Sequence, residues 1–287
     1  MLGWALFLLP ACMHYVTVLP PSEPSADPAP EAAIAADGAA PTPSSTAQSR
    51  PEASAEPAAA AEGPAAAPTV APELLARMTF RGEMPTATSL NDPAAQNANA
   101  SSSYCRKEVE RRKLAVTRVK SAAKGISDTV RISGAFNEVK LVVPEGKHGM
   151  LDCRLALALD DFTKVLHEFG FVSLQIDNFY RPNAKLPGQK KDSQHAHGLA
   201  IDLTVLKTAD GRTFTPADWG ASIGEVACGP DAVMSEPSEA RVDLRNLFCE
   251  VGRRRIFHTV LSPSFNAAHQ SHFHLDIKRD AKHASVR

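Results

Sequence analysis

The sequence predicts an α+β domain in which helices flank a central, mainly antiparallel sheet. Apolar residues make up 44% of the 287 residues, which is enough to build a substantial core. After about residue 100, segments with helical periodicity and segments with strand periodicity both occur, but they do not alternate regularly. Regular alternation would indicate a parallel βαβ fold, so the observed order favours an α+β arrangement.

Residues 1–19 have the character of a targeting segment. Leu2–Ala11 is an apolar run that is too short to span a bilayer and fits the hydrophobic part of a secretory signal. It continues into Leu-Pro-Ala-Cys12, which resembles a bacterial lipobox, in which the cysteine becomes lipid-modified. We therefore expect an exported protein, located in the periplasm or as an outer-membrane lipoprotein, with Cys12 as a candidate membrane anchor.

Residues 20–103 are predicted to form a disordered linker, because Pro and Ala dominate residues 21–70 without helical or strand periodicity. Residues 1–75 hold one basic and eight acidic residues, and the remainder holds 30 basic and 24 acidic residues. The net charge of −1 therefore combines an acidic tail with a mildly basic body. It excludes a chain dominated by a nucleic-acid-binding surface, so no nucleic acid is expected as a partner. The basic body suits an anionic polymer or is simply a solvated surface.

Residues 104–287 are predicted to form the folded domain, beginning with a charged helix at 107–120. Val139–Val143 is rich in β-branched residues and is predicted to be a strand, closed by Pro144. The helix at 151–169 is the clearest element. Its leucines and phenylalanines recur at helical spacing, and a glycine follows them as a C-cap.

The rest of the domain is predicted to be mostly strands. Asp210-Gly211 is a hairpin signal between two of them, and Gly252 is expected to end the last helix. The remaining elements, in chain order, are strands at 172–179, 199–206 and 212–215, a helix at 242–251, and strands at 255–261 and 272–277.

Five cysteines are present. If Cys12 is the lipid site, four remain, and an even number in an exported domain suggests two disulfides. The sequence permits three pairings. We favour Cys105–Cys153 and Cys228–Cys249, which join neighbours in chain order.

Five of the ten histidines lie in two short clusters. The first cluster is Ser193-Gln-His195-Ala-His197-Gly-Leu-Ala-Ile-Asp202, and the second is His269-Gln-Ser-His272-Phe-His274-Leu-Asp276. Random scatter would rarely concentrate half of the histidines in this way, so the clusters are the best candidates for a site.

The clusters indicate a cation site. His272, His274 and Asp276 alternate along an expected strand, so they share one face. Asp202 lies between two apolar residues in another strand, where its carboxylate requires a partner that offsets its desolvation. A metal cation is one such partner, and the alternative is a structural network of hydrogen bonds between His and Asp.

The two clusters also carry a family resemblance. The first resembles the S-x-H-x-x-G-x-A-x-D signature of the zinc D-Ala-D-Ala carboxypeptidase and murein endopeptidase superfamily (the LAS peptidases), and the second resembles its H-x-H element. The wider pattern, from Cys153 through Arg181 and Trp219 to the second cluster, is similar to the bacterial extensin-like C-terminal domain family over about residues 104–278. The resemblance implies an α+β fold of the Hedgehog and DD-peptidase type with a single zinc site.

Carried over position by position, the resemblance implies that His195, Asp202 and His274 hold the zinc ion. Two histidines and one aspartate leave a fourth tetrahedral position open, which is the composition of a catalytic zinc site. His197 falls at a variable position of the signature and is not expected to be a ligand.

The resemblance also implies catalytic roles for His272, Arg181 and His269. Position 271 is Ser271 and no glutamate precedes His274 at the spacing found in some relatives, so either His272 takes the role of the base or the site works differently. Arg181 or His269 is expected to stabilise the oxyanion. Asp276 is expected either to orient a histidine or to form a buried salt bridge.

The function implied by the resemblance is a zinc metallopeptidase that hydrolyses peptide bonds in peptidoglycan cross-links or stem peptides. The H-x-x-H-x-H spacing of the second cluster favours a murein endopeptidase over a D,D-carboxypeptidase. The alternative is a non-catalytic peptidoglycan-binding or scaffold protein that retains the zinc site. Peptidoglycan is the expected partner in both cases.

Overall fold

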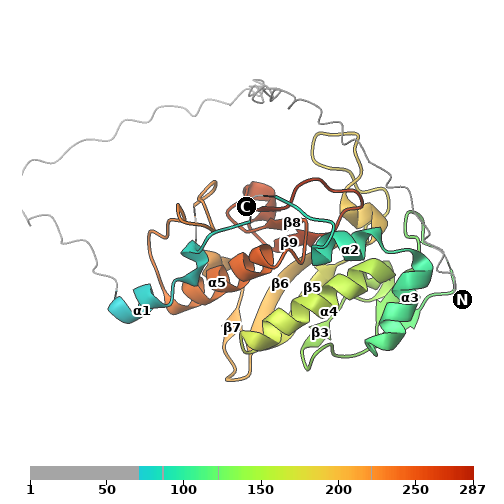
Figure 1. Ribbon diagram of the computed structural model, residues 1–287, viewed down its shortest axis with the longest axis horizontal. Coiled ribbons are helices and arrows are strands. Elements are labelled where there is room, and N and C mark those ends of the chain that lie inside the picture. Colours follow the sequence, from blue (N-terminus) through green and yellow to red (C-terminus); the bar gives the residue numbers. More distant parts are fainter. Residues whose placement is uncertain (1–70, 86, 122, 221) are drawn as a thin grey trace, which may run out of the picture. The chain divides into compact units, whose positions relative to one another are not determined.

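The fold is centred on a seven-stranded sheet, seen in a computed structural model that describes residues 71–85, 87–121, 123–220 and 222–287 (Figure 1). Its strands are β3 Lys140–Val142, β5 Phe171–Asn178, β6 Ala200–Thr208, β7 Thr213–Phe214, β8 Thr259–Leu261, β9 Phe273–Asp276 and β10 Ser285–Val286. They lie in the order β10-β8-β9-β6-β5-β3, and β7 pairs with β6 off this path. Only the β10–β8 and β3–β5 pairs are parallel, which confirms the predicted mainly antiparallel sheet.

A smaller antiparallel sheet of three strands lies beside the first helix of the core. It consists of β1 Val116–Arg118, β2 Thr129–Ile132 and β4 Leu151–Asp152 in the order β1-β2-β4. Since β4 runs directly into that helix, this sheet fixes where the helix begins.

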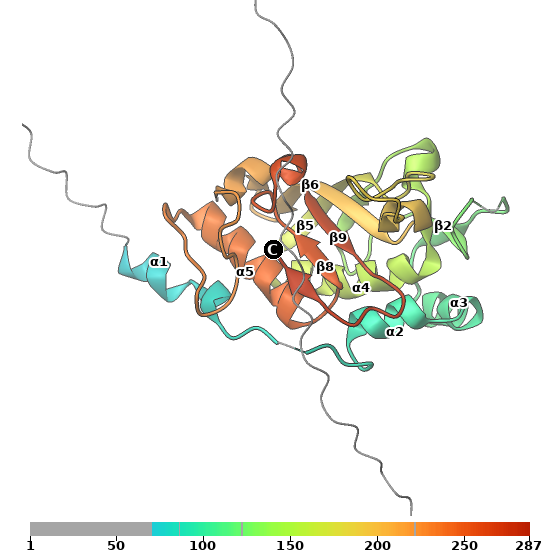
Figure 2. The ribbon, with the colours of Figure 1, turned by 90° about the horizontal axis from the view of Figure 1, so that it is seen from above.

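Two long helices, α4 Cys153–Glu168 and α5 Glu239–Arg253, supply much of the hydrophobic core. The Asp152 and Ser238 side chains accept hydrogen bonds from the first-turn backbone N–H groups of α4 and α5, respectively. Gly170, at φ +78°, lies just beyond the end of α4 as predicted. Both helices lie along the sheet (Figures 1 and 2).

The central strands divide their side chains between two faces. Ile201 and Leu203 of β6 and Phe273 of β9 belong to the main core. Asp202 and His274 alternate with these residues, so they project from the opposite face of the sheet. The polar clusters therefore lie on the face that the core does not use.

The predicted linker end at residue 103 is wrong, because an N-terminal arm, residues 71–85 and 87–100, packs on the domain. It contains α1 Pro72–Ala76, η1 Thr79–Arg81 and α2 Pro93–Asn99. Phe80 is fully buried, and Ala94 and Ala98 belong to the main core. The Phe80 backbone N–H donates to Asn246 Oδ1 of α5 at 2.9 Å. The alanines of α2, whose abundance in this region suggested a linker, are therefore small core residues that pack against α4.

Several element boundaries also differ from expectation. The helix predicted at 107–120 is α3 Ser102–Arg111, and β1 follows it, because Ser101 caps an earlier start and Val116-Thr117 favours a strand. The strand predicted at 255–261 is limited to β8. Gly252 does not end α5 but lies within it, where a Cβ would come within 2.2 Å of Val286 Cγ2. Close packing of β10, rather than helix termination, requires this glycine.

Both favoured disulfides are present. Cys105–Cys153 has a Cα–Cα distance of 6.2 Å and Cys228–Cys249 one of 5.5 Å, and the first ties α3 to α4. Disulfides persist in oxidising compartments, which indicates an extracellular or periplasmic location. Among the described residues, no helix is long and apolar enough to cross a membrane. Cys12 and the signal-like segment lie outside the described residues.

Candidate metal centre

The three expected metal ligands come together from three elements of the fold. His195 lies in the short 3-10 helix η3 Gln194–His197, whose start is capped by the Ser193 hydroxyl. Asp202 of β6 and His274 of β9 are directly paired across the antiparallel sheet. Gly198 ends η3 at φ +61°, and a Cβ there would lie 2.9 Å from Ile126 Cδ1. The signature glycine therefore lets the His195 loop pack closely beside the sheet.

Three side-chain atoms converge at the centre of this group. Asp202 Oδ1 lies 3.0 Å from His195 Nε2 and 3.0 Å from His274 Nδ1, and the two nitrogens are 3.2 Å apart. His195 is fully buried, and Asp202 and His274 are almost completely so. One atom from each residue can thus reach a single point.

The other nitrogen of each histidine is already engaged. His195 Nδ1 donates to the Phe179 carbonyl at 3.1 Å, and His274 Nε2 donates to Asp276 Oδ2 at 3.2 Å. Since a carbonyl and a carboxylate only accept, these contacts place the ring protons on those atoms. On a neutral ring, the nitrogen that faces Asp202 therefore carries a lone pair and can bind a cation. This is the outer-shell pattern typical of metal-binding histidines.

The electrostatics favour a negative Asp202 with one positive charge beside it, which either a proton on His274 or a bound cation can supply. Burial alone would raise the pKa of Asp202, but hydrogen bonds with His195 and His274 outweigh it and hold the pKa well below its usual range. Burial would lower the pKa of His274, but hydrogen bonds with Asp202 and Asp276 outweigh it and raise the pKa to about 9. Burial lowers the pKa of His195 despite its contact with Asp202.

The donor set fits a divalent cation such as zinc. Without a positive charge, two nitrogen lone pairs and a carboxylate oxygen would face one another within about 3 Å. Two imidazole nitrogens and one carboxylate oxygen are common zinc ligands. Among the described residues, His195, Asp202 and His274 are the group whose ligand atoms come close enough to hold an ion.

His272 lies at the edge of the centre, one residue before β9. Its Nε2 is 3.4 Å from Asp202 Oδ1, farther than the ligand nitrogens, and its side chain is 19% exposed. Burial lowers the pKa of His272, although Asp202 opposes the shift. A neutral imidazole at the solvent side of the centre can accept a proton.

Arg181 and His269 flank the centre in different ways. Arg181 Nη2 is 3.8 Å from Asp202 Oδ2, and its side chain is half exposed. His269 Nδ1 donates to Asn266 Oδ1 at 2.7 Å, so a neutral His269 ring has no proton left on Nε2. Burial, with His274 and His272 nearby, lowers the pKa of His269 to about 4. Of the two, Arg181 is therefore the better donor toward a developing negative charge.

Of the two remaining residues discussed from the sequence, Asp276 contacts a ligand histidine and His197 does not. Asp276 bonds to His274 Nε2, which matches the expectation that it orients a histidine. His197, the last residue of η3, faces away from the centre, with Nδ1 3.1 Å from the Gly125 carbonyl, and is not part of the ligand group.

Asn178, at the end of β5, also contacts the centre, although it lies in neither histidine cluster. Its Nδ2 donates to Asp202 Oδ2 at 2.8 Å. No local sequence signal marks this asparagine, because its contact depends on how β5 and β6 pair.

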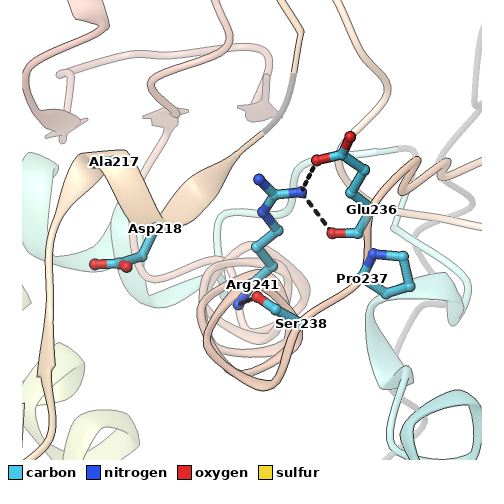
Figure 3. A pocket seen from close by; sticks show the side chains of 6 residues that line it. All are labelled: Ala217, Asp218, Glu236, Pro237, Ser238 and Arg241. Atoms are coloured by element: carbon cyan, nitrogen blue, oxygen red, sulfur yellow. Dashed lines mark hydrogen bonds and ion pairs between the residues drawn. The ribbon is translucent and has the colours of Figure 1, made fainter. Parts of the chain in front are cut away.

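A shallow pocket elsewhere shares no residue with the centre (Figure 3). It has a volume of about 380 Å³ and is lined by Ala217, Asp218, Glu236, Pro237, Ser238 and Arg241. The Arg241 guanidinium is already bound to the carboxylate and carbonyl of Glu236. The charged group of Arg241 is therefore less available to a ligand than the side chains of the histidine centre.

Comparison with known proteins gives one match. The family model described as "Extensin-like protein C-terminus" matches residues 103–286. No curated protein and no solved structure matches the chain.

Proposed function

Since this chain belongs to the extensin-like C-terminal family, and since its signature histidines converge on one point, we propose that it is a zinc-dependent peptidase that cleaves peptide bonds in peptidoglycan. The observation that carries the proposal is the arrangement of His195 Nε2, Asp202 Oδ1 and His274 Nδ1, with the remaining ring nitrogens held by Phe179 and Asp276. The likeness of the signature to that of the LAS peptidases supports the reaction class.

The three converging atoms would hold the ion. Zinc in such a site supplies a Lewis acid for the scissile carbonyl and lowers the pKa of water. With three protein ligands, the coordination sphere remains open to substrate and water.

The flanking side chains would carry the proton and the charge. His272 Nε2 accepts a proton from the attacking water, and the resulting imidazolium lies beside the Asp202 carboxylate. The same proton passes to the departing amine as the C–N bond breaks. Arg181, which is half exposed, turns its guanidinium toward the oxyanion of the tetrahedral intermediate.

The substrate class is supported by location and charge. Two disulfides suit a protein that meets the cell wall rather than the cytosol. The loop after Arg181 carries the exposed Lys190 and Lys191, and also Lys185, which is paired with Asp192. Lys124 from a neighbouring loop bonds to Asn183 within this loop. Peptidoglycan stem peptides carry carboxylates, which these cations would attract.

The test combines metal analysis with digestion of isolated cell-wall sacculi by the purified, disulfide-bonded chain. We expect one zinc per chain, and zinc-dependent release of muropeptides with new amino termini, detected by mass spectrometry. His274→Ala should abolish both zinc binding and release. His167→Ala, an exposed histidine on α4, is the matched control and should change neither.

Two results would overturn the proposal. A chain that takes up no zinc after supplementation has no metal centre. A zinc-loaded chain that binds sacculi but releases nothing is a non-catalytic wall-binding protein.

A further inference from the structure

An irregularity in strand pairing turns Asn178 toward the metal centre. Ile176 of β5 pairs with Leu203, and Asn178 pairs with the next β6 residue, Asp202, so Asp177 is an extra residue on β5. Ile176 points into the main core. By simple alternation Asn178 would point there too, but the bulge at Asp177 reverses it.

Asn178 is placed for its amide N–H and not for its carbonyl. Nδ2 donates to Asp202 Oδ2 at 2.8 Å. The amide oxygen of Asn178 is buried and has no hydrogen-bond partner among the described residues. Leaving a buried acceptor unpaired is costly, so the donor contact must outweigh that cost. A reversed amide would set its oxygen against a carboxylate oxygen, which excludes the opposite orientation.

The two oxygens of Asp202 are thereby given different roles. Oδ1 faces the histidines, at 3.0 Å from His195 Nε2, 3.0 Å from His274 Nδ1 and 3.4 Å from His272 Nε2. Oδ2 faces away, bound to Asn178 and 3.8 Å from Arg181 Nη2. A carboxylate held in this way offers a cation one oxygen and not two.

We infer that Asn178 is a positioning residue that keeps Asp202 a single-oxygen ligand and so gives the centre its preference for zinc over larger cations. The inference rests on the proposed metal centre. Zinc takes four ligands in a tetrahedral arrangement, whereas cations that prefer oxygen take six or more, often with bidentate carboxylates. A carboxylate freed from Asn178 could rotate and present both oxygens.

The experiment compares metal affinities of the full, disulfide-bonded chain. Asn178→Leu keeps the approximate size of the side chain and removes the donor. We expect its zinc affinity, measured by competition with a chelator, to fall 10- to 100-fold, as is typical for the loss of an outer-shell partner. Its Mn²⁺ affinity should fall less, so that the zinc-to-manganese affinity ratio decreases.

Asp177→Asn is the matched control in the same bulge. Asp177 accepts a hydrogen bond from Thr204 and does not bond to Asp202, so this variant should keep the wild-type ratio. If Asn178→Leu does not fold, as judged by circular dichroism, Asn178→Ala serves in its place.

The outcomes separate the inference from the proposed function. If the wild-type chain binds zinc and the Asn178 variant binds both metals with unchanged affinity, or loses both equally, the inference is overturned. If the wild-type chain binds no zinc, the metal centre itself is refuted. A selective loss of zinc in the Asn178 variant supports the inference.

Discussion

The two disulfides close chain loops of different length, and this predicts a measurable order of stabilities. Cys105 and Cys153 are 48 residues apart, and Cys228 and Cys249 are 21 apart. In the chain-entropy model, a crosslink stabilises the fold by restricting the unfolded chain, more so for a longer loop. The two loops correspond to about 4.1 and about 3.3 kcal/mol, respectively, at 25 °C.

The test uses two double variants, Cys105→Ala with Cys153→Ala and Cys228→Ala with Cys249→Ala. Alanine suits these positions because Cys105, Cys153 and Cys249 are buried among apolar side chains. Urea unfolding should show a free energy of unfolding lowered by about 4 kcal/mol in the first variant and about 3 kcal/mol in the second. Losing both bridges would remove about 7 kcal/mol, a large share of the 5–15 kcal/mol typical of folded proteins.

The test of the loop-entropy explanation is which double variant loses more free energy of unfolding. If the variant without the 21-residue loop loses as much stability as the other, or more, native-state contacts and not loop entropy set the contribution of the bridges. The wild-type chain under reducing conditions is the control, and it should match a variant lacking all four cysteines.

Three further predictions follow from the geometry. Gly198→Ala places a Cβ 2.9 Å from Ile126 Cδ1 at a φ of +61°, so urea unfolding should show a loss of about 2–4 kcal/mol; a loss below about 1 kcal/mol would mean that the loop relaxes freely. His272→Ala should retain zinc while turnover falls about 10²- to 10⁴-fold, whereas His274→Ala should lose both; equal loss of zinc in elemental analysis would indicate a four-ligand structural site. Contacts with Lys164 outweigh burial and lower the pKa of Asp160, so its stabilising contribution is complete above its unfolded pKa of about 4 and is lost as the pH falls through the folded value. Asp160→Asn should therefore flatten the acid side of the stability profile, and an unchanged profile between pH 5 and pH 2 would contradict this.

The elements that sequence patterns predicted well are those whose burial is periodic and local. α4 is an example, because its buried leucines recur at helical spacing and Gly170 marks its end. The N-terminal arm was missed for the opposite reason. Its small and polar residues are typical of a linker, and Phe80 becomes a core residue only through partners such as Asn246, far along the chain.

At the candidate site, too, residues in local sequence patterns could be predicted, whereas a residue placed by contacts between strands could not. His195, Asp202 and His274 could be identified because they stand in two dense clusters of unusual composition. Asn178 could not, because its orientation depends on a one-residue irregularity between β5 and β6. Strand register is a tertiary property, and no local pattern around Asn178 encodes it.

The N-terminal arm also sets the order in which the fold can be completed during synthesis. Phe80 and Asn246 are 166 residues apart, and the Ala87 carbonyl and its partner Arg255 are 168 apart. At about 5–20 residues per second, a ribosome needs roughly 10–30 s after making the arm before it makes these partners. Although Phe80 belongs to the first part of the domain to be synthesised, it has no core to enter until α5 has been made.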